Sequence, residues 1–518
     1  MIGLEHRLPA ARLRVKRRGV RRHAVRIARA GRDIAAGWSR TATLALAGNE
    51  GETRSGLRRR PSELERWSAT MRELCELAWP IAAAMLGATA MGIVDTKLVA
   101  GLGAHALAGV GMGTVLMYLG YSVVFGLMRG VKVRSAHATG EGRPADGVRY
   151  AQAGALLGVF AGLAIWAAAR DATVALQLLG IDEQVVPPAR DFLAACTWGA
   201  PACCALAALI QHRQGLGDSR TPMLVGLGAN VHNGLLAYGL IYGHWGLPAL
   251  GVRGAGFATA VTEGLQLLVL LTLLVREARR SDAKLPFARA LREVAGLGVP
   301  TGLHFGCEML AFTAFTALLG SMGTAQLAAH HLSLNVMRAS FLPGLAVAEA
   351  ASVLVGRALG RRSIAEADRV TRAALVLAVG FMALCGLGFA AFGHRIAAAF
   401  TEDPAVIELA TRLLLLAAVF QALDAAYMVL RSSLRGAQEV RWVALVGITV
   451  AWCSIPGAAL LLGRLAGWGA VGGWCGFLLE TAIGALLLWR RWTGGAWRDR
   501  YESPSPATEP PMALGACA

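Results

Sequence analysis

Charged residues are scarce in this 518-residue chain, where Asp, Glu, Lys and Arg together make up 16%, against roughly 25% in soluble proteins. Hydrophobic residues make up 55%, and the mean hydropathy is +0.50. This composition excludes a series of soluble domains and predicts a polytopic membrane protein.

The signatures of several enzyme and channel classes are also missing. The sequence has no Walker A phosphate loop, no HExxH zinc motif, no paired Asp-rich motif of membrane prenyltransferases and no selectivity filter. Its nine cysteines show neither metal-ligand spacing nor a paired extracellular pattern, so we expect packing residues without disulfides. We therefore predict no enzymatic activity, no cofactor and no structural metal.

Positive charge is concentrated at the N-terminus, where residues 1–66 hold seventeen Lys or Arg against six Asp or Glu. This tail lacks the apolar core of a secretory signal. It could be a cytoplasmic arm that binds anionic lipids, a disordered extension, or a translated stretch upstream of a true start at Met71. Because the rest of the net charge of +18 lies mostly in short loops, we expect no nucleic-acid partner.

The apolar segments predict transmembrane helices, because each is about 20 residues or longer and none shows the short alternating pattern of strands. The twelve predicted spans are 75–100, 105–128, 149–169, 191–213, 222–243, 251–275, 294–319, 325–356, 370–394, 406–430, 440–463 and 467–490.

The loops alternate in charge. Loops after even-numbered spans hold 21 Lys and Arg, counting residues within two positions of a span edge, and those after odd-numbered spans hold five. The positive-inside rule then places both termini in the cytoplasm. We predict a basic, disordered extension (1–70), an N-lobe (71–275), a cytoplasmic inter-lobe loop (276–293), a C-lobe (294–490) and a cytoplasmic tail (491–518).

An internal repeat supports two lobes of six helices. A shift of 220 residues aligns Pro80 with Pro300 and Gly103 with Gly323, and Gly140 with Gly360. Six spans per half give both copies the same orientation, so we expect an axis along the membrane normal. The predicted fold class is an all-α membrane protein.

Six acids lie inside predicted spans, where ionisable groups by default mark an ion or substrate pathway. Asp95, Glu308 and Asp424 have no acid at the repeat-related position, which favours functional roles. Roles for Glu263, Glu349 and Glu480 stay open.

Other polar residues in the spans allow two interpretations each. Gln421, three residues before Asp424, could share its site or merely hold the acid. Asn230 and Asn233 could join helices or coordinate a cation. His330 and His331 favour packing over proton transfer.

Several motifs resemble the multidrug and toxic compound extrusion (MATE) family, closest to its NorM-like branch, over about residues 74–490. They are LAWP followed after fifteen residues by the acid of VDT, then GLGAHALAGVG, GLGDSRTPM, LIYGHWGLPALGVRGAGFAT, LGSMGTAQLAAHH and FQALDAAYMVLRSSLRGAQEV. The resemblance implies an inner-membrane exporter of amphipathic, often cationic compounds, driven by antiport of H+ or Na+. We expect it to act as a monomer in the lipid bilayer.

The resemblance also implies roles for individual residues. Asp95, Asn233 and Thr259 match the N-lobe site for protons or a transient Na+. Glu308 and Asp424 match the acids of the seventh and tenth helices, with Gln421 beside them, as a C-lobe site for substrate or ion. Pro80 matches the proline where helix 1 bends.

Two departures from the family pattern favour H+ over Na+. Ala237 stands where the family usually offers Asn or Asp, so the site loses an oxygen ligand. Lys97 follows Asp95 by two positions, although residues at i and i+2 point to different faces of a helix.

Two alternatives remain. A lipid-linked oligosaccharide flippase of the same superfamily should line its cavity with several arginines, and the predicted spans are nearly free of Arg. A membrane receptor or scaffold would transport nothing.

Overall fold

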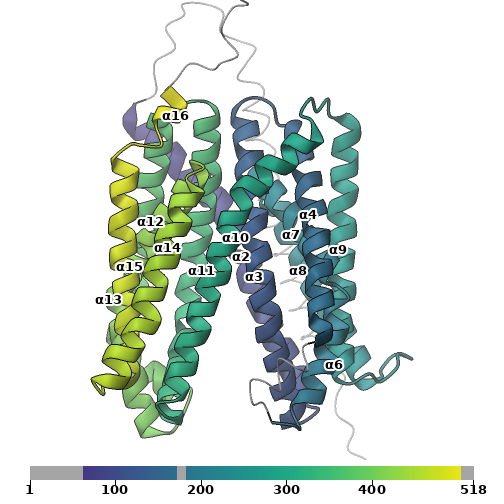
Figure 1. Cartoon of the computed structure of the whole chain (residues 1–518), viewed down its shortest axis with the longest axis vertical. Coiled ribbons are helices and arrows are strands. Elements are labelled where there is room, and N and C mark those ends of the chain that lie inside the picture. Colours follow the sequence, from purple (N-terminus) through teal and green to yellow (C-terminus); the bar gives the residue numbers. More distant parts are fainter. Residues whose placement is uncertain (1–61, 172–181, 503–518) are drawn as a thin grey trace, which may run out of the picture. The chain divides into compact units, whose positions relative to one another are not determined.

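The computed structural model describes residues 62–171 and 182–502, and within these ranges the regular structure is entirely helical. The helices shown in Figure 1 are α2 (Glu63–Ala100), α3 (Ala104–Gly140), α4 (Asp146–Ala168), η1 (Ala169–Asp171), α6 (Val186–Thr197), α7 (Ala200–Gly215), α8 (Arg220–Tyr242), α9 (Val252–Arg280), α10 (Phe287–Gly320), α11 (Thr324–Gly360), α12 (Ile364–Ala398), α13 (Pro404–Gly436), α14 (Val440–Ala458), the π-helix η2 (Ala459–Leu465), α15 (Gly469–Thr493) and α16 (Asp499–Glu502).

Twelve membrane crossings fit this helix set. Within the described residues, eleven helical segments are long and apolar enough to span a membrane, and α6 and α7 together make one further span bent by 54°. The predicted span 191–213 is therefore broken. Gly199 and Pro201 lie at the break, where Pro201 supplies no backbone N–H and is tolerated only in a first helical turn.

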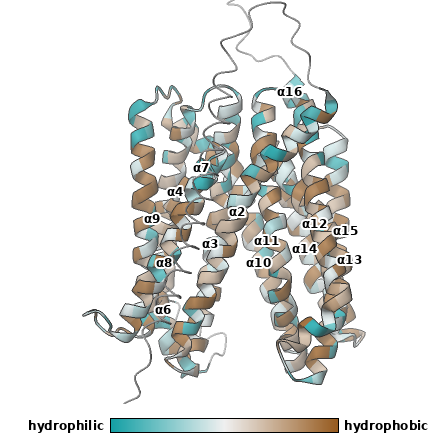
Figure 2. Ribbon diagram, turned by 180° about the vertical axis from the view of Figure 1, so that it is seen from behind, coloured by the Kyte–Doolittle hydropathy of each residue, from teal (hydrophilic) through white to brown (hydrophobic). Residues whose placement is uncertain are grey.

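The spans form two bundles that are joined at one end and diverge toward the end where α6 lies (Figures 1 and 2). Two long helices connect the bundles. Helix α2 contacts α8 of the first bundle and α11 of the second, while α10 contacts α3 of the first and α14 of the second. The two connecting helices begin the two halves of the repeat, which confirms the predicted two-lobe fold.

Glycines allow the lobes to approach closely at the joined end. A Cβ on Gly360 of α11 would lie 2.9 Å from the Cα atom of Gly140 of α3, its repeat partner. A Cβ on Gly126 would lie 2.7 Å from the Cα of Gly302. Contact between the repeat-related Gly140 and Gly360 supports the predicted near-two-fold relation of the lobes.

A second repeat pair has a shared backbone role. Gly103 and Gly323 precede α3 and α11 with φ angles of 105° and 128°, in the region that residues with a Cβ rarely adopt. Both glycines are thus required for the turn that starts the second helix of each lobe.

The helices extend beyond several expected boundaries. Helix α2 begins at Glu63 rather than 71, and only residues 281–286 separate α9 from α10. After α15 the chain packs back on the C-lobe: Trp497 is fully buried, and the Tyr501 hydroxyl donates to the Ala437 carbonyl at 3.2 Å. The expected extension over residues 1–61 and the end of the tail, 503–518, lie outside the described residues.

Candidate functional site

The N-lobe site consists of Asp95 on α2 and Asn233 on α8. The Asn233 Nδ2 group donates to both carboxylate oxygens of Asp95, at 3.1 and 3.3 Å. Asn233 is buried and its Oδ1 atom has no hydrogen-bond partner, whereas Asp95 is half-buried. Asp95 has no cationic partner among the described residues, so its carboxylate can receive a proton or a metal ion.

The other residues expected to form or alter this site are Thr259, Ala237 and Lys97. Thr259 on α9 donates its hydroxyl to the Ala255 carbonyl of its own helix at 3.2 Å, and no described contact joins it to Asp95. Ala237 is buried in an apolar cluster with Val99 and supplies no ligand. Lys97 is exposed and forms no described ion pair with Asp95.

Pro80 lies buried inside α2, which continues through it as one helix. A proline there removes one backbone hydrogen bond. The expected bend at Pro80 remains a prediction.

In the C-lobe, Glu308 of α10 is neutralised by a cation. Arg431 of α13 donates to it at 2.9 Å, and the His304 ring lies 3.8 Å away. Asp424 of α13 has no hydrogen bond or ion pair in the described part of the chain, although it is half-buried. Gln421, fully buried, donates its amide to Ser340 of α11. The structure therefore separates the two expected acids into a paired and an unpaired one.

The observed membrane helices contain more arginine than the predicted spans, contrary to our expectation. Arg129, Arg431 and Arg435 lie within α3 and α13, and all three guanidinium groups lie over the ring of Phe305, at 4.2, 6.0 and 4.9 Å from its centroid. The predicted spans ended at residues 128 and 430, but the helices continue to Gly140 and Gly436. The sequence could have indicated that Arg431 and Arg435 act together, because residues four apart lie on one face of a helix.

Glu349 of α11 forms ion pairs with two cations of the other lobe. Arg129 donates to one of its oxygens at 2.5 Å and Lys132 to the other, with Lys132 and Glu349 side chains 1% and 5% exposed. Arg129 and Glu349 are 220 residues apart and occupy equivalent repeat positions. The pair therefore joins repeat-related positions of the two lobes.

Two further polar groups of the helices are His330 and Glu263. His330 accepts a hydrogen bond from the Trp474 indole at 3.2 Å and lies edge-on to the Phe315 ring, consistent with packing. Glu263 on α9 is partly exposed, forms no ion pair in the described part of the chain and lies within hydrogen-bond range of the Cys203 thiol.

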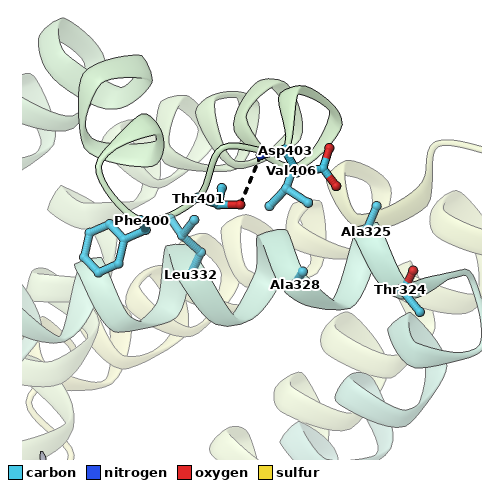
Figure 3. A pocket seen from close by; sticks show the side chains of 8 residues that line it. All are labelled: Thr324, Ala325, Ala328, Leu332, Phe400, Thr401, Asp403 and Val406. Atoms are coloured by element: carbon cyan, nitrogen blue, oxygen red, sulfur yellow. Dashed lines mark hydrogen bonds between the residues drawn. The ribbon is translucent and has the colours of Figure 1, made fainter.

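A separate hollow of about 500 Å³ lies between α11 and the start of α13 (Figure 3). Its one acid, Asp403, caps α13 by accepting from the Ala405 N–H at 2.9 Å. Because this carboxylate is used for capping, the hollow is not a candidate ion site.

Comparison with known proteins assigns the fold and the family. The MatE family model matches residues 80–238 and 300–460, one copy in each lobe. The multidrug resistance protein MdtK of Yersinia pseudotuberculosis is 27% identical over 436 residues, covering 82% of this chain and 95% of MdtK.

Two solved transporters share the fold. The Vibrio cholerae MATE transporter VcmN, in a mutant form, superposes with a TM-score of 0.77 at 19% identity, covering 83% of this chain and 98% of its own. A Pyrococcus furiosus transporter of the MOP superfamily, described as having a binding pocket of reverse polarity, gives 0.76 at 18% identity, with 86% and 100% covered. With the family model covering more than half of the sequence, once per lobe, the chain belongs to the MatE family, the multidrug and toxic compound extrusion transporters.

Proposed function

We propose that the protein is a secondary active transporter that exports amphipathic or cationic compounds in exchange for an inward-moving ion. The observation that carries this proposal is the Asp95 carboxylate, which lies in a membrane helix without a cation and is held by Asn233. An intramembrane acid of this kind can bind an ion on one side of the membrane and release it on the other. The named activity of the relative MdtK, multidrug resistance, supports the same function.

The coupling ion we propose is H+. Sodium needs several oxygen ligands; Asn233 Oδ1 is a buried unpaired amide oxygen beside Asp95, and Ala237 contributes none. A proton needs a single carboxylate oxygen, so the same surroundings are sufficient for it.

The function is tested with purified protein in liposomes loaded with ethidium. A pH gradient is expected to drive ethidium transport at least about tenfold above protein-free liposomes, and a sodium gradient at fixed pH is expected to drive little. No transport under either gradient would contradict an exporter and favour a receptor or scaffold.

The flippase alternative gains support from the partly buried Arg129 and the buried Arg431 and Arg435, because guanidinium groups bind diphosphates. Two of the three, however, are paired with carboxylates of Glu308 and Glu349. Flipping of a fluorescent polyprenyl-diphosphate saccharide in the same liposomes, without ethidium transport, would favour a flippase.

We also propose that the joined end of the bundles faces the cytoplasm, as the basic loops indicate. Cysteines introduced at Ala104 and Thr324, both exposed at the diverging end, should react with a membrane-impermeant maleimide in intact cells. A cysteine at Arg361 should react only after the cells are opened. Labelling of position 361 in intact cells would reverse the orientation.

A further inference from the structure

Another hollow, of about 550 Å³, lies at the joined end of the C-lobe. Its walls come from α10, the turn between α13 and α14, the first turns of α14, the end of α15, and α16, which lies at that end in Figure 1. The predicted spans within α10 and α14 begin at residues 294 and 440, and the one within α15 ends at residue 490. The hollow therefore lies at the level where these three helices meet the membrane surface.

The lining of this hollow is positively charged. Arg441, Arg491 and Arg500 contribute three positive charges, and Glu439 contributes the one negative charge of the lining. Arg441 is exposed and forms no ion pair with another described residue. The lining therefore has a surplus of two positive charges, which favours an anionic ligand.

The carboxylate of Glu439 holds two of the guanidinium groups in place. It is 8% exposed and accepts from Arg491 at 2.6 and 3.1 Å and from Arg500 at 3.2 Å. Arg500 also donates to the Ala437 carbonyl at 3.5 Å. A guanidinium group has five N–H donors, so both arginines keep donors that these contacts do not use. Fixed guanidinium donors suit the oxygens of a phosphate group.

The remaining wall of the hollow is apolar and continues into the outer surface of the helices. Trp442 and Leu445 are 38% and 60% exposed and lie three residues apart, on one face of α14. On α10, a Cβ at Gly296 would meet no atom within 4 Å, and Val299, three residues further, is 49% exposed. A hydrocarbon chain can lie along these side chains while a charged group stays among the arginines.

Orientation of the chain does not account for this arrangement by itself. Basic residues at helix ends fix the topology of a membrane protein wherever they lie in a loop. They need neither a hollow nor a buried carboxylate such as Glu439 that aligns their guanidinium groups. The combination of fixed cations and an apolar wall at the membrane surface is what a bound lipid requires.

We propose that this hollow binds one anionic phospholipid. Its phosphate group lies against Arg441 and Arg500, and one fatty acyl chain lies along Trp442 and Leu445. Glu439 acts as a positioning residue for the arginines. The proposal goes beyond the export function and does not depend on it, since lipid binding can be measured without transport.

The test uses the full-length protein in detergent, without its native cysteines and with Gly296→Cys, labelled by a water-soluble maleimide. Saturating dioleoyl phosphatidylglycerol is expected to slow labelling at position 296 at least about tenfold, because the labelling rate follows the lipid-free fraction. Dioleoyl phosphatidylcholine, which has no net charge, and inorganic phosphate, which has no acyl chain, should each change the rate less than about twofold at the same concentration.

Added substitutions test the role of charge. Arg441→Gln should raise the phosphatidylglycerol concentration for half-protection about fivefold, the effect of one basic residue near a membrane surface. Arg441→Lys keeps the charge and should restore protection. The matched control is Arg395→Gln, which removes an exposed arginine near the end of α12, at the diverging end.

Absence of protection by phosphatidylglycerol would overturn the site. Equal protection by phosphatidylcholine would also overturn it, because that result indicates a general coat of lipid. Protection by inorganic phosphate alone would show a site for free anions in place of a lipid site. An unchanged half-protection concentration in Arg441→Gln would remove the proposed phosphate contact.

Discussion

Replacing Asp95 with Asn is expected to abolish ion-driven export, lowering it at least about a hundredfold, while substrate binding stays within about threefold of wild type. Asparagine has nearly the same shape, and it cannot exchange a proton or carry a negative charge. The hydrogen bond from Asn233 would meet one amide oxygen in place of a carboxylate. The variant would therefore be unable to load and release a proton, so substrate can still bind while the step of the cycle that depends on proton exchange is lost.

Liposome transport under a pH gradient and tetraphenylphosphonium binding in detergent measure the two halves of this prediction. Thr96→Val is the matched control, because Thr96 is exposed on the same helix and donates its hydroxyl to the Gly92 carbonyl at 2.7 Å. Export by Asp95→Asn at the wild-type rate would remove Asp95 from ion coupling. Strong export driven by sodium alone in wild type would reject H+ as the coupling ion.

The N-lobe site could be predicted from the sequence because its signal is local. A lone acid within an apolar span is unfavourable unless it has a role, and this singled out Asp95. Asn233, 138 residues away, was assigned to the same site by the family resemblance, and the structure shows a hydrogen bond between the two side chains. Thr259 was named on the same basis, yet its hydroxyl is used within its own helix.

The inter-lobe contacts could not be predicted in the same way. Hydropathy ends a span where the first charges occur, so Arg129 and Arg431 were counted as loop residues. The helices continue because their charged groups are paired within the protein and need not reach water. Which charged residues pair depends on which helices cross at the joined end. The 220-residue repeat alone does not determine that crossing.

Glu349→Gln is expected to open the joined end of the two lobes and to abolish efficient export. The substitution leaves the buried Lys132 and the partly buried Arg129 without a carboxylate. Removing one partner of a buried ion pair typically costs about 3–5 kcal/mol, and each 1.4 kcal/mol corresponds to about tenfold in an equilibrium. The population closed at this end should therefore fall about a hundredfold or more relative to open states.

A cysteine at Ala136 measures this opening, because Ala136 is fully buried in α3 and faces Gly356 of α11. In a variant without the native cysteines, Glu349→Gln should raise the rate of maleimide labelling at position 136 about a hundredfold. The surface variant Glu408→Gln, which breaks an exposed pair with Arg412, should leave the rate unchanged.

The combined variant Arg129→Met, Lys132→Met and Glu349→Met tests why Glu349→Gln opens the lobes. It distinguishes the effect of unpaired charges from the effect of losing charge attraction altogether. Replacing a whole buried ion-pair group by apolar residues of similar size is often neutral or stabilising, so this variant should protect position 136 again. It should nevertheless export slowly, because an apolar contact has no charges that water can solvate when the lobes separate during the cycle. Slow labelling in Glu349→Gln would contradict a role for this ion-pair group in holding the lobes closed.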